Sequence, residues 1–154
     1  MSSKDMLSLI LSFLFIVCLV PPLVGEANAH GYQRGTLKIV HPWCFDRFEP
    51  ESRDVVVGMA IESAHRRGDR LLRAETQAAQ RVEIQNTDGK PLKYIDIRGK
   101  SRVRLGRAEE AHIRLIGLTP PLIAYGTIPL TLVFERAGRI ETDVMVEEAL
   151  DGSQ

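Results

Sequence analysis

The feature that most constrains the fold is a series of short segments in which apolar and polar residues alternate, separated by turn residues. Nine segments of this kind follow one another from residue 35 to residue 148. They are GTLKIVHPW, DVVVGMAIES, RLLRAE, QRVEIQN, LKYIDIRG, SRVRLG, AHIRLIGL, IPLTLVFERAG and RIETDVMVEE. Alternation with a period of two predicts half-buried strands, and many short strands predict an antiparallel sandwich or barrel. The best candidate for helix is AETQAAQ, one or two turns long.

The first 29 residues have the layout of a secretory signal peptide. Lys4 precedes the apolar run MLSLILSFLFIVCLV, and the segment ends in the small-residue pattern Ala27-Asn28-Ala29. The apolar run has about 15 residues, fewer than the roughly 20 that span a membrane. We therefore expect residues 1–29 to be removed and residues 30–154 to form one exported, periplasmic domain with its core at about 35–147. An uncleaved, membrane-tethering signal is the alternative, whereas the bulky Val17 before Cys18 argues against lipidation.

Composition excludes several classes of function. The chain has 154 residues, no formal net charge and a pI of about 6.9, which argues against nucleic acid and anionic membranes as partners. It has neither a nucleophile elbow nor a glycine-rich phosphate loop, so nothing predicts an enzyme. Cys44 would be the one cysteine left after signal removal. We expect it to be a small buried residue beside Trp43, with a reactive or metal-binding role as the alternative.

Histidines are the candidate metal ligands. Cleavage after Ala29 would make His30 the first residue, and its α-amine and imidazole would form a chelate that suits Cu(II). The alternative is that HGYQRG is a flexible terminus and His30 an accident of the cleavage site. His41 alternates with the core side of its strand and is expected to be partly buried. His65 is expected to lie in a solvated turn, SAHRRGD.

The segment AHIRLIGL carries the fourth histidine. Period-two alternation places His112 and Arg114 on one face of a strand, and Ile113 and Leu115 on the other. From the residues alone, the outward pair is part of a metal site, the relic of one, or solvated surface.

Four segments in their order resemble the PCu(A)C family of periplasmic copper chaperones. They are GTLKIVHPW, VVVGMAIESAHRRGDRLLRAETQAAQRVEI, HIRLIGL and IPLTLVFERAGRIETDVMV, and together they cover about residues 35–147. The resemblance implies an all-β, cupredoxin-like or immunoglobulin-like Greek-key β-sandwich of about 7–9 short strands. It also implies delivery of Cu(I) to the Cu(A) centre of cytochrome c oxidase, with ligands in the pattern His-x(10)-Met…His-x-Met.

This chain departs from that ligand pattern at three of its four positions. Gln85 stands for the first histidine and Asp96 for the first methionine. His112 keeps the second histidine, but Arg114 replaces its methionine. A guanidinium about 4 Å from Cu(I) would cost about 4 kcal/mol at an effective dielectric of about 20. Asp96 is a candidate partner for Arg114 if the fold brings the two together.

The sequence therefore supports two interpretations. In the first, the protein carries copper, as Cu(I) or Cu(II), through His30, joined by His41 or His112. Its partner would be a cytochrome c oxidase subunit or another copper-accepting periplasmic protein, with no nucleic acid and no membrane after signal cleavage. In the second, it has lost Cu(I) binding and is a protein-interaction module, whose polar surface is formed by Gln85, Asp96 and Arg114.

Overall fold

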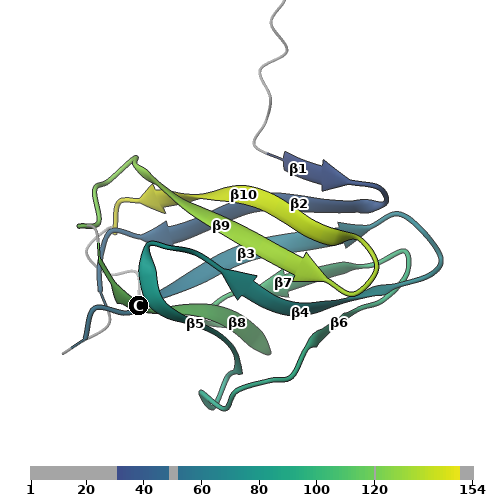
Figure 1. Cartoon of the computed structure of the whole chain (residues 1–154), viewed down its shortest axis with the longest axis horizontal. Helices are drawn as coiled ribbons and strands as arrows, with labels where there is room; N and C mark the ends of the chain where they lie inside the picture. Colours follow the sequence, from purple (N-terminus) through teal and green to yellow (C-terminus); the bar gives the residue numbers. More distant parts are fainter. Residues whose placement is uncertain (1–30, 49–51, 120, 150–154) are drawn as a thin grey trace, which may run out of the picture.

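The computed structural model describes residues 31–48, 52–119 and 121–149, and in these residues it contains ten strands and no helix (Figure 1). The strands are β1 (Gly31–Arg34), β2 (Leu37–Phe45), β3 (Val55–Ser63), β4 (Asp69–Glu75), β5 (Ala79–Asn86), β6 (Ile95–Ile97), β7 (Arg102–Leu105), β8 (Ala111–Leu118), β9 (Thr127–Phe134) and β10 (Gly138–Glu147). In the same residues, no helix is long and apolar enough to cross a membrane.

The nine predicted strands are all present, and in several of them the alternation of the sequence matches the alternation of burial. In β2, for example, Leu37 and Ile39 are buried while Lys38 between them is exposed. The structure adds β1, which pairs with β2. Strand β1 lies in the segment HGYQRG, for which the sequence analysis gave a flexible terminus as one alternative. The helical expectation for AETQAAQ is wrong. There the Thr76 hydroxyl accepts a hydrogen bond from the Ala78 amide (3.1 Å) and supports a bend between β4 and β5.

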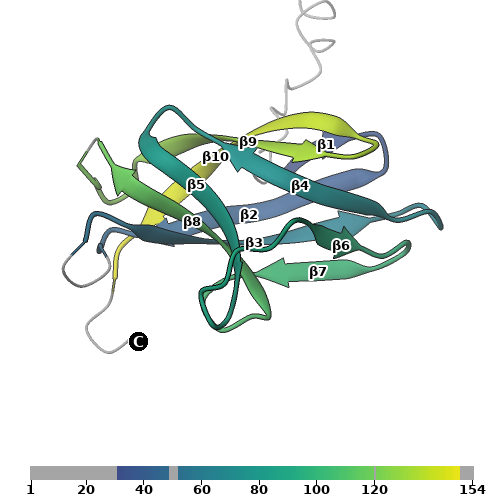
Figure 2. The ribbon, with the colours of Figure 1, turned by 60° about the horizontal axis from the view of Figure 1, so that its bottom comes forward.

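The strands form one sheet that curls back on itself. Its order is β5-β8-β3-β2-β10-β9-β4-β6, with β1 added to β2 and β7 to β3. Figures 1 and 2 show β4, β9 and β10 on one side of the molecule and β3, β7 and β8 on the other. The predicted all-β sandwich is confirmed. One pair departs from the antiparallel expectation, since β10 runs parallel to β2.

The core fills the space between the two sides with aliphatic side chains. Its largest fully buried members come from seven of the strands: Leu37, Ile39, Val57, Ile61, Leu71, Ile97, Ile113, Leu115, Leu118, Leu130, Leu132 and Val144. Burial of such side chains is the main favourable term in folding. The core therefore fixes which face of each strand is left for polar side chains.

Two local features stand out among the strands. The turn after β5 is closed by Asn86, whose side-chain oxygen accepts hydrogen bonds from the Asp88 amide (3.1 Å) and the Lys90 amide (2.8 Å). In β2, the register with β3 shifts between Val40 and Trp43, and His41 in this bulge has a φ of 48°. A bulge inserts one residue and reverses which face the following side chains occupy.

Candidate metal site on β5 and β8

The pairing of β5 with β8 brings two of the four family ligand positions together. Gln85 and His112 are directly opposite one another in the antiparallel register, and Glu83 is opposite Arg114. Opposite residues in such a pair have side chains on the same face, close enough to interact. Both Gln85 (6% exposed) and His112 (8% exposed) are buried. Burial of His112 therefore excludes, for this residue, the solvated surface that the alternation pattern allowed.

A side-chain carbonyl oxygen beside the imidazole has no hydrogen-bond donor among the residues that the structure describes. The Gln85 amide nitrogen donates a hydrogen bond to a Glu83 carboxylate oxygen at 2.7 Å, which fixes the orientation of the amide. Its Oε1 is shielded from solvent and accepts no hydrogen bond within the described residues. The Nδ1 atom of His112 is shielded as well. A buried carbonyl oxygen without a donor costs about 1–3 kcal/mol, so this oxygen is a ready acceptor for a cation or a proton donor.

Arg114 is held by an aspartate that the sequence analysis did not single out. Its Nη2 and Nε donate to Asp54 Oδ2 at 2.9 and 3.2 Å, and the other Asp54 oxygen accepts the Gly117 amide hydrogen at 2.9 Å. The side chains of Arg114 and Asp54 are 31% and 13% exposed. The negative charge of Asp54 offsets the repulsion of about 4 kcal/mol that an isolated guanidinium would exert on copper. Arg114 thus stands in place of a soft ligand, but the Arg114–Asp54 pair together carries little net charge.

Asp96 does not join this site. It lies on β6, which pairs with β4 at the end of the strand order opposite to β5 and β8. Its side chain is 62% exposed and accepts a hydrogen bond from Arg70 Nε at 3.1 Å. The Arg70 guanidinium also lies 4.8 Å from the centre of the Tyr94 ring. Arg70, and not Arg114, is thus the partner of Asp96.

The remaining histidines have different surroundings. His41 is exposed (63% of its side chain), which corrects the expectation that it is partly buried, because the bulge turns it away from the core. Its Nε2 lies 2.8 Å from a carboxylate oxygen of Glu147. His65 is exposed in a turn, as predicted, and its Nδ1 accepts a hydrogen bond from the Arg67 amide at 3.1 Å. His30 lies outside the described residues.

The three sulfur-containing side chains that the structure describes supply no further ligand at this site. Cys44 is fully buried, as expected, and burial raises its pKa to about 12, with Glu147 and Asp46 contributing. Met59 is buried in the core on β3, and Met145 is half-buried on β10. Within the described ranges, no three His, Cys, Asp or Glu side chains are grouped to hold a metal. The site on β5 and β8 consists of one imidazole, one amide and the flanking charges.

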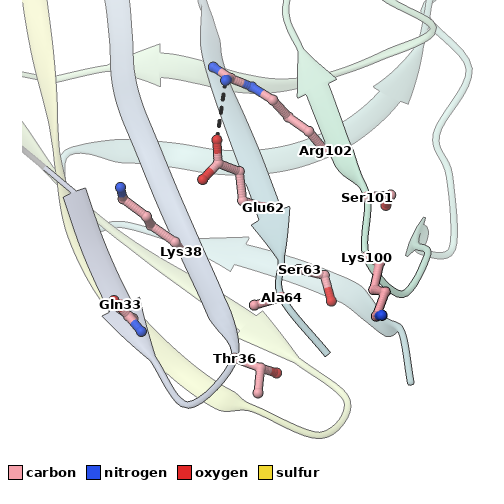
Figure 3. A pocket seen from close by; sticks show the side chains of 9 residues that line it. All are labelled: Gln33, Thr36, Lys38, Glu62, Ser63, Ala64, Lys100, Ser101 and Arg102. Carbon is pink, nitrogen blue, oxygen red and sulfur yellow. Dashed lines mark ion pairs between the residues drawn. The ribbon is translucent and has the colours of Figure 1, made fainter. Parts of the chain in front are cut away.

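A separate concave surface of about 500 Å³ lies where β2, β3 and β7 run side by side (Figure 3). Lys38 is opposite Glu62 in the β2–β3 register, and Arg102 donates to Glu62 at 3.1 Å. Lys38, Lys100 and Arg102 outnumber the single carboxylate of Glu62, so this surface carries an excess of positive charge. The surface contains none of the family ligand positions.

Fold and site together define the class of this protein, a PCuAC-like β-sandwich domain. The LpqE-like family model, whose description reads "Putative lipoprotein LpqE-like", matches residues 37–146, and the chain belongs to that family. No curated protein matches it.

Solved structures support this class. The copper-bound PCuAC domain from PmoF2 is 27% identical, with a TM-score of 0.69 over 78% of this chain and 99% of that domain. The apo form of the same domain is 26% identical, with a TM-score of 0.66 over 77% and 95%. The solution structure of CuI-DR1885 from Deinococcus radiodurans, 20% identical with a TM-score of 0.62 over 82% and 86%, shares the fold.

Proposed function

We propose that this protein is a copper carrier of the PCuAC type and that copper binds at His112 with the side-chain oxygen of Gln85. The observation that carries the proposal is the buried Gln85 Oε1, for which the described part of the chain supplies no donor, on a residue directly opposite the buried His112 in the β5–β8 register. A copper ion between them would satisfy that oxygen. The similarity to the copper-bound PmoF2 domain supports copper as the ion.

The donor set favours cupric over cuprous copper. The family pattern joins imidazoles to soft thioethers, which select Cu(I), whereas this site offers an imidazole and an amide oxygen, which are harder donors. The Arg114–Asp54 pair leaves little net charge, so a divalent ion does not meet an uncompensated guanidinium. We expect a binding role without catalysis, in which the ion is cargo.

The acceptor and the compartment follow from the family resemblance and the N-terminal segment. The proposed acceptor is the Cu(A) subunit of cytochrome c oxidase or another copper-accepting periplasmic protein. The proposed location is the periplasm after cleavage at Ala29. Because the family is described as one of lipoproteins, a lipid tether at Cys18 joins the uncleaved signal as an alternative. Intact mass of the protein recovered from cell fractions distinguishes these cases.

Two measurements test whether the protein transfers copper and which side chains bind it. The copper-loaded protein is mixed with an apo Cu(A) subunit, and transfer is followed by the absorption of the acceptor. The double variant Gln85→His, Arg114→Met rebuilds half of the family's His/Met pattern, and we expect it to shift preference from Cu(II) toward Cu(I) in competition titrations. His65→Ala is the matched control, since that side chain lies in an exposed turn. An unchanged preference would contradict the assignment of the site.

A second function has its own supporting observation. The Arg114–Asp54 ion pair fills the position of the lost methionine and makes three hydrogen bonds there, so the site is also stable as a purely structural unit. A protein-interaction module is the function expected on that basis. It predicts that neither Cu(I) nor Cu(II) binds the wild-type protein above background.

A further inference from the structure

Positive charge gathers on the outer face of strands β2, β3 and β7, although the chain as a whole has no formal net charge. The strand register places Lys38, Glu62 and Arg102 side by side across these strands (Figure 3). Arg104 is two residues further along β7 and is therefore on the same face as Arg102. Lys100 precedes β7 and lines the same concave surface. The basic surface is defined here as Lys38, Lys100, Arg102 and Arg104.

The basic surface has little negative charge to neutralise it. Glu62 is the one carboxylate among the residues that line the concavity, and it is paired with Arg102 at 3.1 Å. The other three members of the basic surface are exposed, and within the described residues they make no ion pair. Arg70 and Arg114, by contrast, are paired with aspartates. The basic surface is therefore open to carboxylates from outside the chain.

Backbone contacts between two turns hold one end of the basic surface in place. The Lys100 amide donates a hydrogen bond to the His65 carbonyl at 2.8 Å, which joins the β6–β7 turn to the β3–β4 turn. A Cβ on Gly99 would overlap the carbonyl oxygen of Arg66, so the two turns are in direct backbone contact. Arg66 and Arg67 are exposed in the β3–β4 turn and extend the positive charge beyond the concavity.

The basic surface and the β5–β8 site lie on the same face of the sheet. Strands β7 and β8 pair with successive parts of β3, where Glu62 is opposite Arg102 and Val56 is opposite Arg114. Val56 and Glu62 are an even number of positions apart, so these opposite pairs share a face. His112 is two residues from Arg114 on β8 and is on that face too. A partner bound to the basic surface therefore faces the side chain that we propose binds copper.

Shape and chemistry favour a protein over a lipid bilayer as the partner. The surface is hollowed, with a volume of about 500 Å³, whereas a bilayer is flat on this scale. Membrane-binding surfaces expose large apolar side chains, and in the described part of the chain the large exposed ones, Tyr94, Ile123 and Tyr125, are not among its lining residues. Glu62 in the centre of the row would repel a uniformly anionic surface but can match a protein with spaced charges.

We infer that the basic surface docks an acidic patch of a partner protein and that this partner is the protein that accepts copper. The identity of the partner rests on the proposed function, whereas its acidic character rests on the basic surface alone. Complementary charge speeds association and is weakened by salt. Contacts of this kind are typical of transient complexes, which a carrier needs in order to dissociate after delivery.

The docking is tested on metal-free protein with a peptide of alternating Glu and Ser, and binding is measured by calorimetry. We expect the peptide to bind, its counterpart with Gln in place of Glu not to bind, and Lys38→Glu with Arg104→Glu to weaken binding about tenfold or more. Lys90→Glu with Lys93→Glu is the matched control, because it reverses two exposed charges between β5 and β6, and it is expected to change the affinity less than about twofold. Equal melting temperatures of the two double variants establish that both are folded.

The identity of the partner is tested by copper transfer to an apo Cu(A) subunit. We expect Lys38→Glu with Arg104→Glu to slow transfer about tenfold at low salt and to leave the equilibrium affinity for Cu(II) unchanged. An unchanged transfer rate would contradict this identity of the partner.

The docking surface is refuted if the Glu peptide does not bind, or if both double variants weaken its binding equally. It is also refuted if phosphatidylglycerol vesicles bind the protein more tightly than the peptide does. Because the peptide is tested without copper, a protein that binds the peptide but no copper contradicts the proposed function and leaves the docking surface supported.

Discussion

Replacing Asp54 by Asn tests the ion pair that stands where the family's methionine would be. The substitution keeps shape and one carbonyl oxygen but removes the charge that Arg114 faces at 2.9 and 3.2 Å. A hydrogen bond to a charged group contributes about 1.5–3 kcal/mol, and the arginine is partly exposed and can regain water. We therefore expect the free energy of unfolding to fall by about 2 kcal/mol, and the melting temperature by about 6–10 °C.

Urea unfolding of four proteins measures the coupling directly. They are the wild type, Asp54→Asn, Arg114→Met and the double variant, which form a double-mutant cycle. The coupling free energy is expected to be about 1–2 kcal/mol, because Asp54→Asn then costs little once the arginine is gone. The contact with the Gly117 amide remains in both backgrounds and cancels. If Asp54→Asn costs the same in both backgrounds, the ion pair does not stabilise this protein and the reasoning is refuted.

Three further predictions concern packing and the buried thiol. A Cβ added to Gly58 would lie 2.6 Å from Trp43 Cε2. We therefore expect Gly58→Ala to lower the free energy of unfolding by about 1–3 kcal/mol and to shift the tryptophan fluorescence. Gly106→Ala is the control and is expected to stay near wild type, because the nearest atom to its added Cβ is 3.7 Å away. Ile113→Ala removes a fully buried side chain and is expected to cost about 2–5 kcal/mol in urea unfolding; a cost under 1 kcal/mol would contradict the described core. Burial raises the pKa of Cys44 from 9.0 to about 12, so the contribution of this thiol to stability is present below pH 9 and is lost as the pH rises toward 12. We expect thiol reagents to label Cys44 only after unfolding, because the side chain is buried. Rapid labelling of the native protein at pH 8 would contradict that burial.

Alternation predicted the strands because burial of aliphatic side chains dominates their stability. The same rule failed at His41, where one inserted residue reversed the face, and no local pattern marks a bulge in GTLKIVHPW. It also missed β1, since GYQR has little apolar character and is a strand through its hydrogen bonds to β2. Thr76 likewise makes a bend through contacts that a helical pattern does not reveal.

The candidate site, like the fold, could be predicted from the sequence only in part. The positions of Gln85 and His112 could be named from the resemblance, but that they are opposite each other and buried required the register of β5 and β8. The partner of Arg114 was missed, because Asp54 is 60 residues away and nothing in its local sequence distinguishes it from other carboxylates. Long-range pairing of charges depends on topology, which also separates Asp96 from this site.

Copper binding at His112 is the property on which the proposed function depends. The most direct test is an equilibrium Cu(II) titration of wild type, His112→Ala and His65→Ala, each with a serine before His30 so that N-terminal chelation is absent. We expect one bound ion in the wild type and in His65→Ala, with affinity reduced about tenfold or more by His112→Ala. Equal affinity in all three proteins, or no binding in any of them, would contradict it.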